Sequence, residues 1–371
     1  MRIAYLLNTL AIGGAERQVV ALAERMAARG HVVEILVLRE TCANEVLTEF
    51  PVHYLNMRRN ATSVARGLLK AARLLRSFRP DILHSHNFHG NFSARVLKLA
   101  WPSIRVLSTL HNEYEGGWAR MLSYRLTDFL SYHTVAVSHA AAMTGVARGA
   151  VPQRKCSVIC NGIDAAEFTP NPDRRNTLRA EMNTLEHFIW MTAGRMVPAK
   201  DYPNLLLAFA RVHKAAPAAQ LWIVGEGNSE YTASLRVIAV HLGLETAVRW
   251  LGLRRDVAAL LDAADGFVLA SAWEGMPLAV GEAMAMEKPI VATRVGGVEE
   301  LAGNCAILAP SHDPAALATA MVSIVNTPRE AREFLGGAAR QRILDHFNIQ
   351  TKAIEWEGCY RAVLGLGEPE S

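Results

Sequence analysis

The sequence predicts an α/β protein of two domains, each built on a parallel β-sheet with helices on both faces. Its 371 residues are long for one hydrophobic core and comfortable for two. Apolar runs of strand length alternate with helix-like segments in each half, which is the pattern of parallel sheets. A polar, turn-rich stretch at 160–176, CNGIDAAEFTPNPDRRN, lies between the two halves and is typical of an interdomain linker.

The strand-like runs of the first half are separated by helices such as GAERQVVALAERMAARG at 14–30. These runs are RIAYLLN, VVEILVL, ILHSH, VLSTLHN and TVAVS. The second half restarts the pattern with FIWMTAGR, QLWIVGEG, AVRWLG, GFVLAS and PIVAT. Ligands of parallel sheets collect outside the carboxyl ends of the strands. Two such domains facing each other would therefore enclose a cleft lined by the strand-to-helix loops.

Composition favours a globular protein without a membrane span. Hydrophobic residues make up 51% of the chain and charged residues 20%. The opening MRIAYLLNTLAIGGAER is typical of a first strand rather than a signal peptide. The longest stretch without Asp, Glu, Lys or Arg, at 129–147, carries two His and several hydroxyls and is a poor membrane span. Cysteines 42, 156, 160, 305 and 359 are scattered and lack zinc spacing, so we expect a reduced, cytoplasmic compartment.

The positive charge is concentrated in the first half of the chain. Residues 1–170 hold 20 Lys and Arg against 12 Asp and Glu, whereas residues 171–371 hold 19 against 23. Much of the excess lies at 58–79, which has seven basic residues and no acid. Helical spacing puts Val64, Leu68, Ala72 and Leu75 in one stripe and Arg66, Lys70 and Arg73 on another face. Such a helix could lie on an anionic membrane, or its stripe could simply pack on the sheet.

Residues 271–285, SAWEGMPLAVGEAMA, place two acids, Glu274 and Glu282, in an apolar segment. A buried carboxylate needs a partner, because an unpaired buried charge is costly. The pattern predicts strand, turn and helix, with Pro277 at the first helical position and Gly275 in the turn. The free N–H groups of such a turn favour phosphate. The acids are then suited to accept hydrogen bonds from hydroxyls, which a nucleotide sugar offers on its ribose and its hexose. The alternative is a solvated pair on the helix exterior.

Two cations, Arg195 and Lys200, share one loop of the second half. If they flank the anion site at 275–278, they would clamp a diphosphate and stabilise it as a leaving group. The alternative is that both side chains are simply solvated.

Motifs that the sequence lacks argue against several kinds of metal-binding and nucleotide-binding site. The chain contains no Asp-x-Asp, so a metal held by paired carboxylates is not expected. It has neither a GxxxxGK[ST] loop nor a dinucleotide fingerprint. His84, His86 and His89 are possible metal ligands, because His84 and His86 share one face of a strand. No carboxylate or Cys lies among them at 84–89, and we expect no metal.

Eight short motifs, distributed over nearly the whole chain, have the order and spacing of those in a known protein family. They are GGAER at 13–17, HNEYEGG at 111–117, NGID at 161–164, GRMVPAK at 194–200, GEG at 225–227, GLRRDV at 252–257, EGMPLAVGE at 274–282 and GG at 296–297. The chain resembles family 4 of the retaining nucleotide-sugar glycosyltransferases, which have the GT-B fold. The resemblance implies two Rossmann-like domains facing across a cleft. Residues 1–165 would bind the acceptor and 166–348 the donor, with a last helix at 349–371 crossing back to the first domain.

The resemblance also implies a donor site. Glu274 would contact the transferred sugar, Glu282 the ribose, and Arg195 with Lys200 the diphosphate. The catalytic residues would be Glu274, Arg195, Lys200 and His111, which would lie near the reaction centre. The remaining donor-binding positions would be Gly13 and Gly14 toward the phosphates, Gly225, Arg254 beside the base, and the backbone of Gly275, Met276, Pro277 and Leu278. Asp201 and Met286-Glu287 depart from the common family pattern of Gly after the Lys and of a small residue followed by Gly.

The implied activity is retaining transfer of a hexose from a nucleotide sugar, with UDP favoured, to a glycan or polyprenyl-linked acceptor. The stretch from 111 to 138 is similar to that of enzymes building bacterial exopolysaccharide, capsule or O-antigen. No cofactor, metal or nucleic acid is expected, and the enzyme would be peripheral at the inner face of the cytoplasmic membrane. Two alternatives share the fold: a nucleotide-sugar 2-epimerase, which should lack the paired glutamates, and a non-catalytic sugar-binding homologue, which should have lost Glu274, Arg195 or Lys200.

Overall fold

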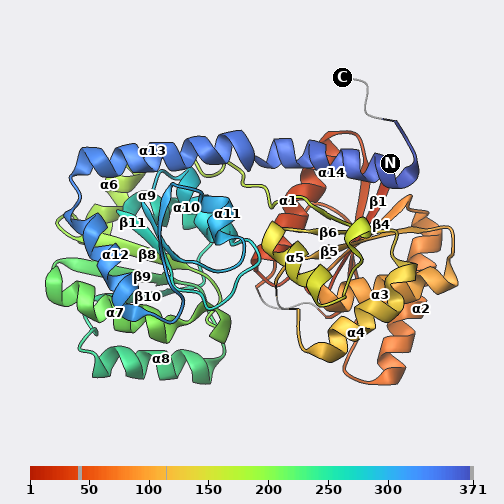
Figure 1. Ribbon diagram of the computed structural model, residues 1–371, viewed down its shortest axis with the longest axis horizontal. Coiled ribbons are helices and arrows are strands. Elements are labelled where there is room, and N and C mark those ends of the chain that lie inside the picture. The colour runs from red at the N-terminus through yellow and green to blue at the C-terminus, as the bar shows by residue number, and fades with distance from the viewer. Residues whose placement is uncertain (41–43, 114, 368–371) are drawn as a thin grey trace. The chain divides into compact units, whose positions relative to one another are not determined.

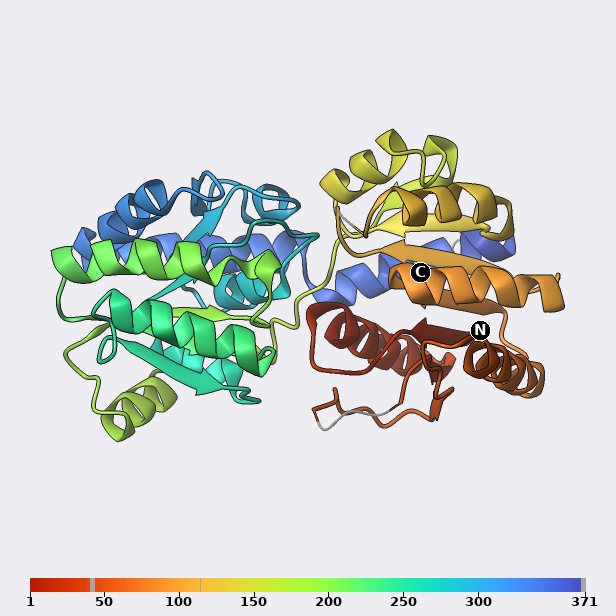
Figure 2. The same ribbon diagram turned by 90° about the horizontal axis from the view of Figure 1, so that it is seen from below.

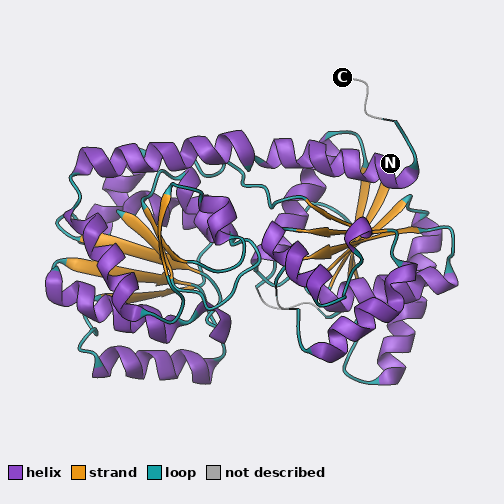
Figure 3. Cartoon of the chain, in the orientation of Figure 1, coloured by secondary structure: helices purple, strands orange, loops and turns teal. Residues whose placement is uncertain are grey.

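The computed structural model describes residues 1–40, 44–113 and 115–367, and Cys42 therefore lies outside the described residues. The chain divides into two compact units, Met1–Gly162 with Ile349–Ser371, and Ile163–Asn348. Each unit contains a parallel sheet with helices around it (Figure 3). The predicted α/β class with two parallel-sheet domains is confirmed. Cys156, Cys160, Cys305 and Cys359 are free thiols.

The described residues of the first unit form a seven-stranded parallel sheet with the order β3-β2-β1-β4-β5-β6-β7. Its strands are β1 (Arg2–Leu7), β2 (Val32–Val37), β3 (Val52–Tyr54), β4 (Ile82–His86), β5 (Arg105–Leu110), β6 (His133–Ala136) and β7 (Cys156–Val158). The five expected strands are present. The two that the sequence did not predict, β3 and β7, are three-residue edge strands, too short to give a periodic signal.

Alternation along β1 explains how helices cover both faces of this sheet. Ile3, Tyr5 and Leu7 pack in one core cluster with side chains of α1 and α14, whereas Ala4 and Leu6 pack in another with those of α2 and α3. Figure 1 labels these four helices and β1. The main helices of this unit are α1 (Gly14–Ala28), α2 (Ala61–Phe78), α3 (Asn87–Ala100), α4 (Trp118–Thr127), α5 (His139–Ala147) and α14 (Ile349–Leu364).

The C-terminal helix α14 is attached to the first unit by polar as well as apolar contacts. The hydroxyl of Tyr360 lies 3.1 Å from that of Tyr5 and 2.8 Å from Nδ1 of His84. Glu357 accepts a hydrogen bond from Arg29 at 2.5 Å and pairs with His31 at 3.0 Å. These contacts anchor the end of the chain to residues that precede it by more than 270 positions.

The buried stripe of α2 differs from the predicted one. The buried residues are Gly67, Ala71, Leu75 and Phe78, whereas Val64 is exposed. Small residues set the contact face, because they let the helix approach closely: a Cβ on Gly67 would lie 2.4 Å from the side chain of Met57. The predicted stripe was wrong at Val64, and its Leu68 and Ala72 are only half-buried, because the buried face of α2 includes Gly67 and Ala71.

The described residues of the second unit form a six-stranded parallel sheet with the order β10-β9-β8-β11-β12-β13. Its strands are β8 (Phe188–Ala193), β9 (Ala219–Val224), β10 (Val248–Gly252), β11 (Gly266–Leu269), β12 (Ile290–Thr293) and β13 (Ala306–Ala309). Its helices are α6 (Pro172–Glu181), α7 (Tyr202–Ala215), α8 (Ser229–His241), α9 (Val257–Ala263), α10 (Leu278–Ala285), α11 (Val298–Ala302), α12 (Pro314–Asn326) and α13 (Arg329–His346). One core cluster joins the sheet to α7, α8 and α12, and Figure 2 shows α7 and α8 together on that face.

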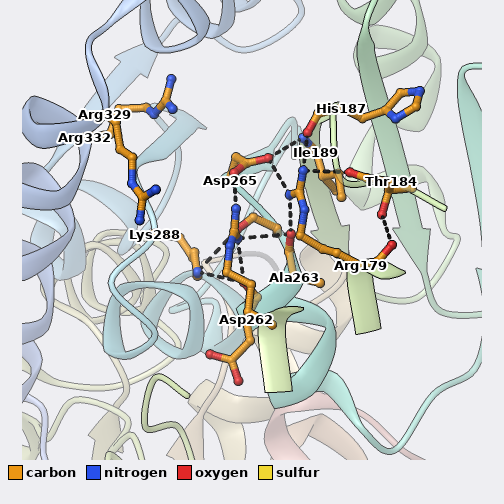
Figure 4. Close-up of polar contacts among 12 residues, drawn as sticks. Arg179, Thr184, His187, Ile189, Asp262, Ala263, Asp265, Lys288, Arg329 and Arg332 are labelled. Carbon is orange, nitrogen blue, oxygen red and sulfur yellow. Dashed lines mark hydrogen bonds and ion pairs between the residues drawn. The ribbon is translucent and has the colours of Figure 1, made fainter. Parts of the chain in front are cut away.

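A network of charges fixes the start of β11 against β8 (Figure 4). Asp265 accepts hydrogen bonds from Arg179 at 2.9 Å and from the Ile189 N–H at 2.8 Å. Burial alone would raise the pKa of Asp265, but Arg175, Arg179 and the Ile189 N–H together lower it. Burial, with Arg175 beside it, lowers the pKa of Lys288 to about 8. These charges hold in place two strands whose carboxyl ends lead into the candidate site.

Candidate functional site

The turn between β11 and α10 has the predicted strand, turn and helix order, with one correction. The prediction that Pro277 is the first helical residue was wrong. It is the N-cap, with φ −76° and ψ 113°, and the helix begins at Leu278. The ring of Pro277 fixes φ but leaves ψ free, so the residue can remain extended and lengthen the turn by one position.

Both glutamates of this segment are buried, which excludes the solvated pair. Glu274 is 8% exposed, and its Oε1 accepts hydrogen bonds from Lys200 Nζ at 2.5 Å and from Ser271 Oγ at 2.6 Å. Glu282 is 3% exposed in the second turn of α10. The partner that a buried carboxylate requires is therefore Lys200 for Glu274, and Ser271 adds a neutral donor.

The glycine pair at 296–297 explains how the Glu274 turn is held. Gly296 has φ +52°, and a Cβ on it would lie 2.0 Å from the carbonyl oxygen of Glu274. The N–H of Gly297 donates to the carbonyl of Gly275 at 2.7 Å. No other residue type permits this approach, so the pair fixes the backbone that carries the carboxylate.

The two cations of the loop after β8, Lys200 and Arg195, differ in their exposure to solvent. Lys200 ends the short turn η3 (Pro198–Lys200) and is paired with Glu274, with its side chain 21% exposed. Arg195, at the start of the loop, is exposed to solvent. The structure thus brings Lys200 to the predicted anion turn and leaves Arg195 accessible on the same loop.

Close glycine contacts stack the loops after β8, β9 and β10. Gly225 has φ +132°, and a Cβ on it would lie 2.1 Å from the carbonyl oxygen of Gly194. Its N–H donates to Gly252 at 2.7 Å, and the Met196 N–H donates to Glu226 at 2.8 Å. The loops that contain GRM, GEG and GLRRD are therefore one hydrogen-bonded layer beyond the strand ends.

The other predicted donor-binding residues of the second unit lie in this region with different exposure. Arg254 forms two hydrogen bonds to the Asp256 carboxylate, at 2.7 and 2.5 Å, which raise the pKa of Arg254 and lower that of Asp256. The Met276 and Leu278 side chains are buried, so only backbone groups of that turn suit a ligand.

In the first unit, Gly13 and Gly14 form the start of α1. Gly13 is the N-cap with extended backbone, and a Cβ on it would lie 2.6 Å from Oε2 of Glu16. Gly14 is exposed as the first helical residue. The Glu16 carboxylate of the first turn therefore lies beside Gly13, and Gly14 is the exposed position at the amino end of α1.

His111 follows β5 and is buried. It contacts His86, which the sequence singled out only as a possible metal ligand, and Glu115, to which the sequence assigned no role. Its Nε2 lies 3.0 Å from Nδ1 of His86, and its backbone N–H donates to Glu115 at 3.1 Å. Tyr124 donates to the other oxygen of Glu115 at 2.6 Å. Burial lowers the pKa of His111 to about 4 and raises that of Glu115 to about 7. The only sequence signal for Glu115 was its place in HNEYEGG.

The three histidines tested for metal have other partners or surroundings. His84 Nε2 lies 2.7 Å from Thr109 Oγ1 and its Nδ1 contacts Tyr360. Burial lowers the pKa of His89 and, more strongly, those of His84 and His86. Within 1–40, 44–113 and 115–367, no group of three or more His, Cys, Asp or Glu is arranged to hold a metal ion.

Comparisons with known proteins agree with this architecture. Residues 12–167 match the sequence model of Glycosyltransferase Family 4, and residues 187–327 match that of Glycosyl transferases group 1. A glycogen synthase of Mycobacterium tuberculosis is 28% identical over 77% of this chain and 70% of its own length. An Escherichia coli enzyme named UDP-Gal:alpha-D-GlcNAc-diphosphoundecaprenol alpha-1,3-galactosyltransferase is 26% identical, with 76% of each protein covered.

The fold is shared with solved structures. Anabaena HepE in complex with UDP-glucose superimposes with a TM-score of 0.89 at 20% identity, over 98% of this chain and all of that one. The chain therefore belongs to the GT-B glycosyltransferases, as a hexosyltransferase with a family 4 domain followed by a group 1 domain. Within its described residues, no helix is long and apolar enough to cross a bilayer.

Proposed function

We propose that this chain is a retaining glycosyltransferase that moves a hexose from a UDP-sugar to a glycan or polyprenyl-linked acceptor in cell-surface polysaccharide synthesis. The observation that carries the proposal is the buried Glu274, paired with Lys200 on the glycine-held turn before α10. A fold shared with proteins solved with UDP and UDP-glucose supports a UDP donor. The named acceptor of the Escherichia coli relative supports a polyprenyl-linked acceptor.

In this proposal the second unit binds the donor and the first the acceptor. Glu282 accepts hydrogen bonds from the ribose, Arg254 borders the base, and Arg195 with Lys200 binds the diphosphate. The backbone of Gly225 and of Gly275 to Leu278 receives phosphate and sugar. Gly13 and Gly14 approach the phosphates, and His111 lies near the reaction centre.

Glu274 binds the hexose, and its pairing with Lys200 argues against a role as nucleophile. A carboxylate that already accepts bonds from a lysine and a serine is stabilised and poorly nucleophilic. We therefore favour front-face transfer. The bond from C1 to the phosphate oxygen breaks, the acceptor oxygen bonds C1 on the same face, and the acceptor proton passes to the departing diphosphate. Lys200 and Arg195 stabilise the charge that develops on that leaving group.

The function is tested first by screening nucleotide sugars for thermal stabilisation, because a ligand that binds only the folded state raises the melting temperature. The stabilising donor is then incubated with and without lipid-linked acceptors, and the anomeric proton of any product is assigned by NMR. A product with retained configuration is expected. Epimerisation of the donor without an acceptor, or stabilisation without any turnover, would favour the epimerase or the non-catalytic homologue.

We also propose that transfer needs no divalent metal, because Lys200, Arg195 and a helix amino end can supply the positive field. Turnover should be unchanged by EDTA. Activity that is lost in EDTA and restored by magnesium or manganese would contradict the proposal that these groups alone stabilise the charge on the leaving diphosphate.

We propose further that the protein is cytoplasmic and attaches peripherally to an anionic membrane through the first unit. The basic segment 58–79 supports this, and so does a second surface at 117–155. That segment holds five Lys and Arg against one acid, Asp128, which is buried and paired with Lys155. Trp118 and Phe129 within it are 79% and 74% exposed. Exposed apolar side chains flanked by cations fit the interface of an anionic bilayer.

A further inference from the structure

Among the described residues of the first unit, the ring of His111 has one polar contact, with the ring of His86. Nδ1 of His86 lies 3.0 Å from Nε2 of His111, and the two side chains are 2% and 7% exposed. His86 ends β4 and His111 directly follows the paired strand β5, so the contact is fixed by the sheet register. Burial lowers the pKa of both rings, to about 4 for His111, so both are neutral at pH 7. One ring therefore donates the shared proton and the other accepts it.

The surroundings of His86 indicate which ring donates. Its Nε2 is buried and has no hydrogen-bond partner among the described residues. Its neighbours there are the rings of His84, at 4.1 Å between centroids, and Tyr5, at 6.0 Å. In protein interiors, an N–H donor without a hydrogen-bond partner is rarer than an acceptor without one. The proton of His86 therefore belongs on Nδ1, where it is donated to His111. By contrast, both ring nitrogens of His84 are paired.

This assignment fixes the tautomer of His111. Because its Nε2 accepts from His86, its own proton must be on Nδ1. The backbone of the same residue is held separately, by the Glu115 carboxylate. We propose that His86 is a positioning residue that keeps His111 in the Nδ1–H tautomer, so that His111 donates a hydrogen bond to a substrate oxygen and is not a general base. The proposed contact with substrate rests on the proposed transferase function, whereas the tautomer does not.

The test is a long-range ¹H–¹⁵N correlation spectrum of protein labelled with ¹⁵N-histidine, recorded without substrate at pH 7. The His111 signals are assigned by their loss in His111→Gln. We expect a protonated Nδ1 and a bare Nε2 in the unmodified protein. In His86→Phe the His111 signals should shift toward the Nε2–H form. The matched control is His133→Gln, which removes a half-buried histidine of β6 that bonds Ser157 and should leave the His111 signals unchanged.

An Nε2–H signal for His111 in the unmodified protein would overturn the proposal, and this outcome requires no variant to fold. With the donor found by screening, kcat of His86→Phe should fall by roughly tenfold, as for one misdirected hydrogen bond, with little change in donor KM. A bare Nδ1 together with full activity in His86→Phe would also contradict it. If no transfer is found at all, the spectrum still decides the tautomer, so failure of the proposed function is distinguishable.

Discussion

At the scale of single residues, two buried carboxylates have different partners and should behave differently. Glu274 accepts from a lysine, whereas the donors to Glu115 among the described residues are neutral: the Tyr124 hydroxyl and the His111 N–H. Burial is the largest influence on Glu115, and it raises the pKa of this carboxyl to about 7 despite those hydrogen bonds. Glu115 therefore titrates near neutral pH because of its surroundings.

The raised pKa of Glu115 predicts a pH dependence of stability. A carboxyl whose pKa is higher in the folded state contributes stability that is fully present below its unfolded pKa, near 4.5, and is lost as pH rises through about 7. The contribution of Glu115 to the free energy of unfolding should therefore fall between pH 4.5 and 7, whereas the buried histidines of the same unit, whose pKa is lowered, contribute in the opposite direction. In Glu115→Gln this fall, of about 1–3 kcal/mol, should be absent.

Urea unfolding at pH 5 and pH 7 measures this difference. Glu113→Gln is the matched control, because it removes a less buried carboxyl two residues away. An identical pH dependence in the unmodified protein and Glu115→Gln would show that Glu115 is ionised in the folded state throughout.

Part of the candidate site could be predicted at this scale. Residue type alone indicated that a buried Glu274 needs a partner. The prediction assigned it sugar hydroxyls and assigned Lys200 the diphosphate, whereas the structure pairs the two side chains with each other. The contacts of His111 with His86 and Glu115 were not predicted, because they depend on strand register and on how the loop folds back. Sequence spacing carries neither kind of information.

At the scale of elements, the two departures from the family pattern both fall on left-handed backbone. Asp201 has φ +44° and is the N-cap of α7, and Glu287 has φ +58° after the end of α10. The N–H of Glu287 donates to Met284 and that of Lys288 to Ala283, both at 3.0 Å, which is the Schellman arrangement. Glycine adopts this conformation without strain, so the structure explains why the family pattern favours it at both positions.

This explanation predicts that Glu287→Gly stabilises the second unit. Relief of the left-handed strain outweighs the entropy that glycine adds to the unfolded chain, for a net gain of about 0.5–1 kcal/mol. Urea unfolding checks it, with Glu287→Ala as the control that keeps the Cβ. Equal stability of the Gly and Ala variants would show that the backbone at 287 is not strained.

Membrane attachment is a prediction at the scale of α2 and of the segment formed by α4 and the short turn η1 (Asp128–Leu130). Reversing Arg66, Lys70 and Arg73 to Glu should abolish sedimentation with vesicles that contain anionic lipid, and salt should weaken binding of the unmodified protein. Trp118→Ser with Phe129→Ser should reduce binding at every salt concentration, because it removes apolar area rather than charge.

The control for the second variant is Val237→Ser with Val240→Ser on α8, where both valines are 53% exposed. If both variants fold and still sediment with the vesicles as well as the unmodified protein does, these two surfaces do not bind the membrane.

At the scale of the whole molecule, the alternation of strands and helices was enough to predict two parallel sheets and the order of their main strands along the chain. The edge strand β13 was missed, although β11 and β12 of the same length were predicted. It is partly exposed, with Ile307 39% exposed, and so differs from those two fully buried strands. The buried face of α2 differs from the predicted stripe, because it includes the small residues Gly67 and Ala71, which allow close packing. Close backbone approaches of this kind appear only after folding, although the glycines that permit them are visible in the sequence.

In the proposed mechanism, the two buried glutamates, Glu274 and Glu282, bind different ends of one donor. Glu282→Ala should weaken binding of the nucleotide, even without its sugar, because it removes the predicted partner of the ribose. Glu274→Ala should leave nucleotide affinity nearly unchanged, because it removes a sugar contact and frees Lys200 for the diphosphate. Turnover should nevertheless fall sharply in Glu274→Ala, since the lost contact is made to the reacting sugar.

Isothermal titration calorimetry of UDP with the unmodified protein and the two folded variants tests this most directly. We predict a Kd at least about tenfold higher in Glu282→Ala, as for one lost charge-assisted hydrogen bond, and a Kd within about twofold of the unmodified protein in Glu274→Ala. Glu274→Ala losing as much UDP affinity as Glu282→Ala, or Glu282→Ala binding UDP as tightly as the unmodified protein, would contradict the assignment of the pair.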